Sequence, residues 1–290
     1  MNHSPMHYFM NPRHWWIFLA LIAAFSGAGL IYTGRATYTD APPVADFTDT
    51  SGRMVITRDT IIAGQKIFQQ YALMEYGSMF GDGAGRGPDY TADALHYLDL
   101  AMKEFYLIRD QSQSTAETRE SAALARVSAE LKRNNYNAQE NRIQISEARS
   151  YAFSRLEQRY QSFFDGSDSK EGFKPSGYIR DPAAIRNLSA FFFWGVWVCA
   201  TARPGETASY THNWPFDPEA GNTAPPAVLM WSMIGLLALA LTLGLCLYFY
   251  GHFDRLNTEL AIADRPNLLG AAEATNFNAS ALQRSTYKFF

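Results

Sequence analysis

Cysteine is nearly absent from this sequence, which limits the kinds of site that it can build. Cys199 and Cys246 are the only two in 290 residues, and both lie in apolar segments. Cysteines in such settings are usually small buried side chains, so we expect neither a disulfide framework nor a cysteine-held metal. The six histidines are scattered, and none has a partner at the spacing of metal ligands. His96 stands among aromatic residues, and we expect it to be buried in the core.

An excess of charge of one sign is also missing. The chain has 25 Lys and Arg against 28 Asp and Glu, a formal net charge of -3. No basic patch of the kind that binds nucleic acid is present. Phosphate-binding loops and nucleophile elbows are absent as well. The sequence therefore offers no catalytic set of its own and no sign of a nucleic-acid partner.

Two stretches lack charge altogether, at residues 15–32 and 227–250. A helix of roughly 20 apolar residues crosses the hydrocarbon core of a bilayer, and aromatic residues favour its two edges. We therefore predict transmembrane helices at residues 15–33 and 227–250. The alternative for the first stretch is a cleaved signal peptide. Its apolar core is longer than usual for such a peptide, and no Ala-x-Ala site follows it.

The two predicted spans divide the chain into three other parts. Arg13, Arg255 and Arg265 flank the spans on one side, and Arg35 on the other. Because basic residues prefer the cytoplasmic side, residues 1–14 and 251–290 are expected to be cytoplasmic. Residues 34–226 then form a soluble domain in the periplasm or outside the cell.

Capping residues and apolar spacing predict that this domain is mainly α-helical. We expect helices over about residues 57–74, 91–109, 114–134, 146–164 and 181–202, with a short hairpin at 136–145. The expected capping residues, in chain order, are Thr57 or Asp59, Thr91 or Asp93, Ser114 with Glu117, Ser146, and Asp181 before Pro182.

The remaining segments are expected to be irregular. Residues 39–53 are predicted to be an extended linker, and residues 77–88 and 209–226 to be turn-rich loops. Asp82 and Asp89, in the glycine-rich loop, are expected to be solvated carboxylates rather than cation ligands. The second half of the last helix is apolar on all sides but too short to cross a bilayer. We expect it to lie on the membrane-facing side of the domain or against a partner.

One helix matches the opening helix of a class I cytochrome c domain, through the pattern Ile62-x-Gly64-x-x-x-Phe68. In that family the sequence Cys-x-x-Cys-His-Gly follows three residues later. Here Ala72 and Glu75 occupy the two cysteine positions and Tyr76 the histidine position. Covalent haem attachment needs thiols, so no c-type haem can form at these positions.

Several separated motifs then resemble the N-terminal part of quinol-dependent nitric oxide reductases, from the first span to the last residue. The motifs are Tyr38-x-x-Ala41-Pro42-Pro43, Ala63-Gly64-Gln65, Tyr76-Gly77-Ser78, Gly81-x-Gly83-Ala84, Gly87-Pro88-Asp89-Tyr90-Thr91-Ala92, Phe192 to Trp197, Arg203-Pro204-Gly205, Ser209-Tyr210-Thr211-x-Asn213-Trp214-Pro215 and Gly221-Asn222-Thr223.

The resemblance implies a cytochrome c-like domain without haem, in the inner membrane of a bacterium, capping a helical bundle related to the haem-copper oxidases. That bundle would hold haem b, haem b3 and a non-haem iron, and reduce 2 NO to N2O with electrons from a quinol. Family members often have a calcium-binding tyrosine where this chain has Gly85. The backbone of Gly83 is then the one candidate calcium ligand on this chain.

By the same resemblance, a third transmembrane helix would begin where the sequence stops, at Phe290. We therefore expect either a truncated sequence or a split gene whose second chain supplies the catalytic part, and this chain alone to be inactive. The alternatives are the same module of a nitric oxide dismutase, a non-enzymatic adaptor with two anchors, and a sensor ectodomain.

Overall fold

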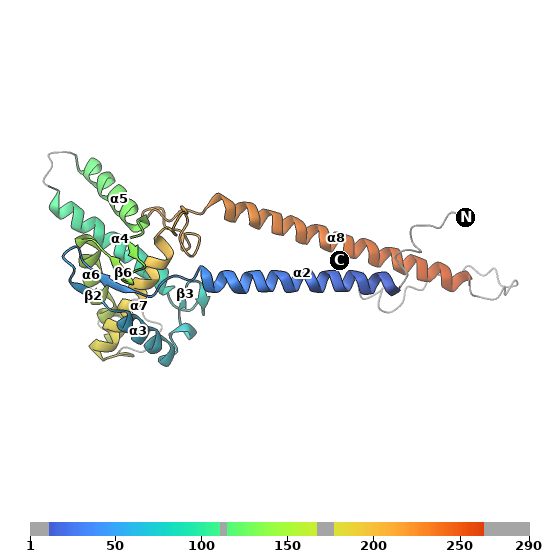
Figure 1. Cartoon of the computed structure of the whole chain (residues 1–290), viewed down its shortest axis with the longest axis horizontal. Helices are drawn as coiled ribbons and strands as arrows, with labels where there is room; N and C mark the ends of the chain where they lie inside the picture. Colours follow the sequence, from blue (N-terminus) through green and yellow to red (C-terminus); the bar gives the residue numbers. More distant parts are fainter. Residues whose placement is uncertain (1–11, 111–114, 167–176, 264–290) are drawn as a thin grey trace. The chain divides into compact units, whose positions relative to one another are not determined.

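The computed structural model of the chain describes residues 12–110, 115–166 and 177–263. The chain divides into two compact units, Met1–Val228 and Leu229–Phe290. The described part of the second unit belongs to one helix, α8 (Pro226–Ala263), which begins just before the boundary. Figure 1 shows the order of the elements along the chain.

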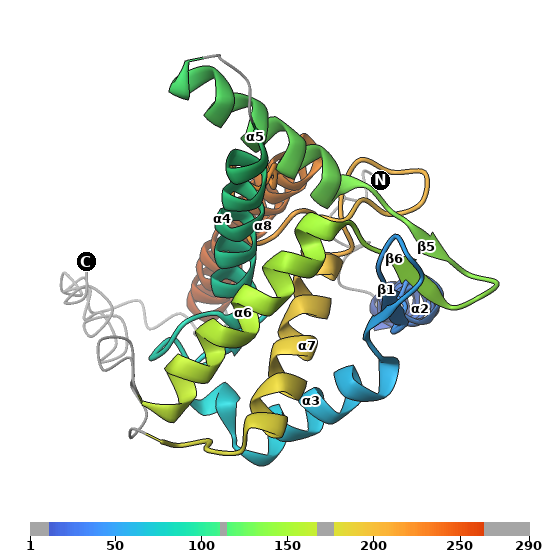
Figure 2. The ribbon, with the colours of Figure 1, turned by 90° about the vertical axis from the view of Figure 1, so that its left-hand side faces the viewer.

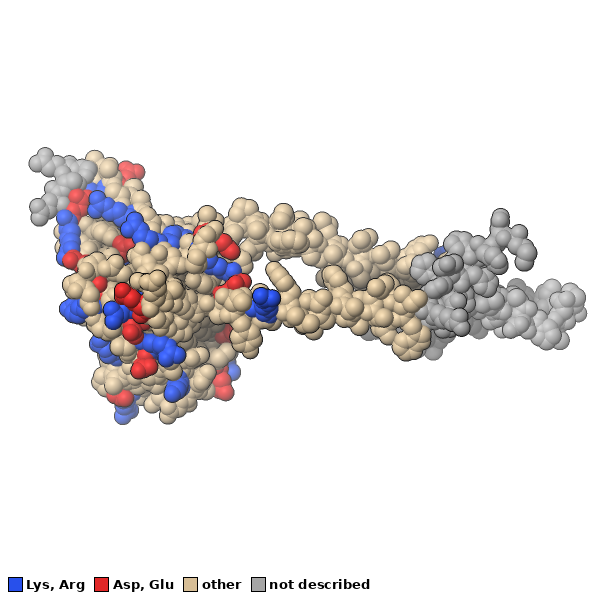
Figure 3. Space-filling model, viewed as in Figure 1, with Lys and Arg blue, Asp and Glu red and all other residues tan. Residues whose placement is uncertain are grey.

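Two long apolar helices match the two predicted membrane spans. α2 is Pro12–Thr39, and its stretch Trp16–Thr39 has a mean hydropathy of 1.9. In α8 the corresponding stretch, Pro226–His252, has a mean hydropathy of 2.2. Neither stretch is buried in the protein, and most atoms along the two helices in Figure 3 belong to uncharged residues. Both helices are therefore suited to a lipid surrounding, and α2 continues past its predicted end at residue 33.

The first unit contains a mainly helical domain, as predicted. Its helices are α3 (Arg58–Gln70), η1 (Leu73–Glu75), α4 (Tyr90–Arg109), α5 (Ala116–Lys132), α6 (Glu147–Asp165) and α7 (Pro182–Ala200). The side chains of Thr57, Ser146 and Asp181 cap α3, α6 and α7 as expected, each accepting a hydrogen bond from a backbone N–H.

Two predicted helix boundaries were wrong. α3 stops at Gln70 instead of reaching residue 74, because Ala72 adopts a left-handed conformation with φ 47° that ends the helix. α4 is capped by Asp89, ahead of both predicted caps. For α5 the capping residue is Thr115, while the predicted cap, Ser114, lies outside the described residues.

α7 is the centre of the domain, which corrects the prediction that its second half lies on the membrane-facing side or against a partner. It contacts α3, α4, α5 and α6, and 14 of its 19 residues are buried. Figure 2 shows α4, α6 and α7 alongside one another, with α3 crossing the N-terminal half of α7. A fully buried Leu- or Phe-sized side chain contributes about 1.5–3 kcal/mol. Since Phe192 is fully buried and Phe193 nearly so, α7 contributes a large share of the stability of the fold.

A small sheet closes one side of the domain. Its strand order is β2-β1-β6-β5, from β1 (Asp46–Thr48), β2 (Met54–Ile56), β5 (Tyr136–Asn137) and β6 (Arg142–Gln144). The predicted hairpin is confirmed as β5 and β6. The predicted linker at residues 39–53 was wrong, since β1 pairs with β6 in parallel. Phe47 of β1 packs edge-on against Phe193 of α7, with ring centroids 5.4 Å apart.

The crossing of α3 and α7 depends on Gly64. A Cβ atom there would collide with the Asn187 carbonyl and lie 2.7 Å from Phe191 Cβ. We predict that Gly64→Ala destabilises the domain by about 1–3 kcal/mol through overpacking, despite the better helix propensity of alanine. Urea unfolding of the detergent-solubilised chain, followed by circular dichroism, measures the change. Gly85→Ala is the matched control, because a Cβ there meets nothing within 4 Å. Equal stability of the two variants would contradict the packing argument.

Candidate functional site

The positions that correspond to haem attachment lie in a tight turn after α3. Ala72 and Tyr76 are half-buried, and Glu75 is exposed. Between them the buried side chain of Leu73 anchors the short helix η1 in the core. Tyr76 packs against Tyr178, with ring centroids 6.2 Å apart. A methyl group, a carboxylate and a phenol stand where a c-type haem needs two thiols and an imidazole.

Aromatic rings fill the interior beside this turn. Tyr90 and Phe192 stack in parallel with centroids 4.8 Å apart, and Phe68 meets Tyr90 edge-on at 5.7 Å. Tyr160 closes the group, with its ring centroid 4.8 Å from that of Phe192. Such ring pairs contribute roughly 0.5–1.5 kcal/mol beyond the burial of their area. The residues present do not fit a covalently attached haem, because they offer no attachment group and their side chains occupy the neighbouring interior.

The glycine-rich loop, residues 77–88, is held by the carboxylate of Asp89. Its Oδ2 accepts hydrogen bonds from Ser78 Oγ at 2.6 Å and from the Gly81 N–H at 2.9 Å. Its Oδ1 accepts from the N–H groups of Thr91 and Ala92 and so caps α4. Asp89 is therefore not the solvated carboxylate that we expected. It joins the loop to the helix that follows, while Asp82 is exposed as predicted.

Close backbone packing explains why this loop is rich in glycine. At Gly77, a Cβ atom would lie 2.7 Å from the ring of Tyr90. Gly83 has φ 137°, and a Cβ there would lie 2.9 Å from Ser78 Cα. Gly83 pairs with Ser78 where β4 (Asp82–Gly83) meets β3 (Ser78–Met79). Among the described residues, no group of three or more His, Cys, Asp or Glu is arranged to hold a metal, so calcium binding at Gly83 stays a prediction.

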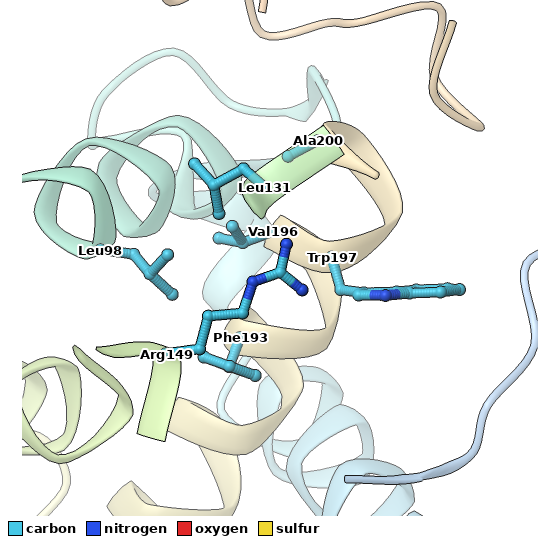
Figure 4. A pocket seen from close by; sticks show the side chains of 7 residues that line it. All are labelled: Leu98, Leu131, Arg149, Phe193, Val196, Trp197 and Ala200. Carbon is cyan, nitrogen blue, oxygen red and sulfur yellow. The ribbon is translucent and has the colours of Figure 1, made fainter. Parts of the chain in front are cut away.

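A cavity between α7 and its neighbours is too small for a cofactor. Its volume is about 10 Å³, which has room for one water molecule at most. Figure 4 shows Arg149 among the apolar side chains that line it, including Leu98, Phe193 and Trp197. Burial lowers the pKa of Arg149 to about 10, and its guanidinium donates to the carbonyl oxygen of Glu130 at 2.6 Å. This charge therefore has a structural role.

A second polar group, the half-buried side chain of Lys132, organises the loop before α8. Lys132 Nζ donates to Asn213 Oδ1 at 2.9 Å and to Asn222 Oδ1 at 2.6 Å. The Asn222 amide in turn donates to the carbonyl oxygens of Cys199 and Pro215. Desolvation lowers the pKa of Lys132 to about 8. No local pattern in the sequence indicates this network, since its members lie far apart along the chain.

The isolated His and Cys residues behave differently from one another. His96 is exposed and lies beside Asp217, with Nδ1 3.9 Å from Oδ2, so its predicted burial was wrong. Cys199 is a buried free thiol in α7, as expected, whereas Cys246 lies exposed on α8.

Sequence reasoning missed Asp99, a carboxyl on the buried face of α4 that is 0% exposed. The available signal was its position between the core residues Leu95 and Met102.

We predict that Asp89→Ala loosens the glycine-rich loop and exposes it to trypsin at Arg86. Loss of the helix cap and of two loop hydrogen bonds costs about 1 kcal/mol each, enough for at least a tenfold rise in local opening. The rate of cleavage after Arg86 in the folded chain, followed by mass spectrometry, tests this. Asp82→Ala is the control on the same loop and should be cut at the wild-type rate. An unchanged rate in Asp89→Ala would contradict the role of Asp89.

Comparison with known families agrees with this geometry. The family model for the cytochrome c-like domain of the nitric oxide reductase protein NorB matches residues 44–216, more than half of the chain. No curated protein matches the chain significantly. The matched segment begins just before β1, passes through the turn at Ala72 to Tyr76, and ends in the loop before α8. The chain thus belongs to the NorB family of nitric oxide reductases, within which residues 44–216 form the cytochrome c-like domain.

Proposed function

We propose that this chain is the haem-free capping module of a quinol-dependent nitric oxide reductase. The observation that carries the proposal is the turn after α3. In a domain of the cytochrome c-like family, Ala72, Glu75 and Tyr76 replace every group that would attach a c-type haem. The stacked rings of Tyr90 and Phe192 support the same conclusion, because they make the interior a packed core.

A domain without haem takes no part in electron transfer, so electrons reach the catalytic centre by another route. Direct delivery from a quinol in the membrane is the route that fits a membrane protein of this family. The reduction of 2 NO to N2O needs two electrons and two protons, and releases one water. Bringing two NO together requires metal centres, which proteins hold and tune through their ligands. We infer that haem b, haem b3, the non-haem iron and any calcium belong to a catalytic membrane region or second chain that this module caps.

The role of this chain is then positional. α2 and α8 anchor the domain in the lipid bilayer, with apolar side chains such as Phe25 and Leu239 facing outward. The core around α7 keeps the domain rigid, and Asp89 fixes the glycine-rich loop. The proposed location is the inner membrane of a bacterium, with the domain on the periplasmic side. Such a module serves an enzyme of denitrification without carrying out its redox chemistry.

We predict that the purified chain is colourless and does not consume NO. None of its histidines has the spacing to hold a haem beside a second iron. A pyridine haemochrome assay and an NO electrode, with a reduced quinol as donor, give the two measurements. The positive control is the membrane complex isolated gently, in which we expect this chain to co-purify with a haem-bearing region and NO to be consumed. Stoichiometric haem in the isolated chain, or turnover above the detergent blank, would refute the proposal.

The proposed orientation gives a separate prediction. A phosphatase fused near Gln113 should be active, since phosphatase folds outside the cytoplasm, and one fused after Asn257 should be silent. The physical reason is the distribution of basic residues: Arg13, Arg255 and Arg265 flank the spans on the proposed cytoplasmic side, and Arg35 flanks them on the other. A cytoplasmic reporter such as green fluorescent protein at the same two positions should show the opposite pattern. The reverse result with both reporters would place the domain in the cytoplasm.

A further inference from the structure

Asp99 is a carboxyl buried inside the domain. It lies on the face of α4 that points into the core, between Leu95 and Met102, and is 0% exposed. Neither of its oxygens has a hydrogen-bond partner among the residues that the structure describes. An ionised carboxylate in such a place is costly, because burial removes its hydration and nothing replaces it. The neutral acid is far less costly to bury.

The surroundings of Asp99 add to the cost of its charge. Asp217 and Glu219, on the turn formed by residues 217–222, face it from outside α4 and repel its negative charge. On α4 itself, His96 and Lys103 attract it more weakly. Lys103 donates a hydrogen bond to the carboxylate of Glu120 on α5, so part of its positive charge is already neutralised by that carboxylate. Desolvation first, and then Asp217 and Glu219, raise the pKa of Asp99 to about 6.

The turn beside Asp99 is closed by its own hydrogen bonds and anchored at one end, where the buried side chain of Asn222 belongs to the Lys132 network. The N–H of Asn222 donates to the carbonyl of Asp217 at 2.8 Å, and the N–H of Asp217 to the carbonyl of Asn222 at 2.9 Å. Asp217 Oδ1 accepts from the N–H groups of Glu219 and Ala220. The side chain of Ala220 is fully buried in the core. With Asn222 anchored, opening would be a movement of residues 217–221 that withdraws the single methyl group of Ala220 from the core and gives Asp99 access to water.

We propose that Asp99 is a proton-binding site that controls closure of the 217–222 turn over α4. With its proton bound, Asp99 is compatible with the closed turn. When the proton leaves, the negative charge favours an open turn in which water hydrates the carboxylate. This inference does not depend on the proposed function, since it follows from the domain alone.

The direction of the pH dependence follows from the raised pKa. In the open turn Asp99 has the usual aspartate pKa of about 4, and in the closed turn a pKa of about 6. The closed state therefore binds the proton of Asp99 more tightly than the open state. The resulting stabilisation of the closed turn relative to the open turn is fully present below about pH 4. Opening grows about tenfold per pH unit from pH 4 to pH 6 and then levels off, a total of about a hundredfold.

Hydrogen exchange of the full chain in detergent, followed by mass spectrometry from pH 4 to 8, tests the proposal. After correction for the intrinsic exchange rate, the protection of the peptide covering residues 217–222 should fall as the pH rises from 4 to about 6. Above pH 6 its protection should stay constant. Asp99→Asn and Asp99→Leu should abolish this dependence, because neither side chain binds a proton here. Asp82→Asn, on an exposed loop, should leave it unchanged.

Two further variants identify the titrating group. Glu219→Gln removes one repelling charge, so the dependence should remain and level off at a lower pH. His96→Gln should keep the dependence, because the histidine is not its source. A dependence that persists in both Asp99 variants, or that disappears in His96→Gln, would overturn the proposal. So would a wild-type peptide whose protection does not change with pH, which would mean that Asp99 is already hydrated in the closed turn.

Discussion

The burial of α7 is the constraint on which the rest of the domain depends. This helix is apolar around most of its circumference, so it needs partners on all sides, and α3, α4, α5 and α6 supply them. The sheet covers what remains through the contact of Phe47 with Phe193. Because one helix sets the positions of all its neighbours, the turn after α3 and the start of α4 are brought together. The conformation of the glycine-rich loop follows from that arrangement.

Local signals in the sequence were sufficient for much of the fold. Thr57, Ser146 and Asp181 each cap a helix through a bond that spans only two or three residues, so their role could be predicted without tertiary information. The replacement of the haem-attachment groups by Ala72, Glu75 and Tyr76 could also be recognised from a linear pattern. In these cases the deciding interactions lie within one short segment.

Several errors arose where the deciding interaction is distant along the chain. The strand β1 pairs in parallel with β6, and nothing near Phe47 indicates that partner. The length and composition of α7 suit an interfacial helix as well as a core helix, and only the packing of other helices distinguishes them. The same limit applies to Asp99, because the charges of Asp217 and Glu219 come from a loop more than a hundred residues later. His96 was misplaced since aromatic neighbours in sequence do not guarantee burial.

The composition of α7 also bears on how the chain is made. During synthesis the insertion machinery sorts segments by hydrophobicity, and it meets α7 before the domain is complete. α7 has a mean hydropathy of 1.3, against 1.9 and 2.2 for the stretches in α2 and α8. Arg186 and Asn187 lie in its first turns, and a charged residue is unfavourable in a span, by about 2.5–3.5 kcal/mol at the helix centre on the insertion scale. In the proposed topology these polar residues favour release of α7 into the periplasm, where the helix completes the core, over its retention in the lipid.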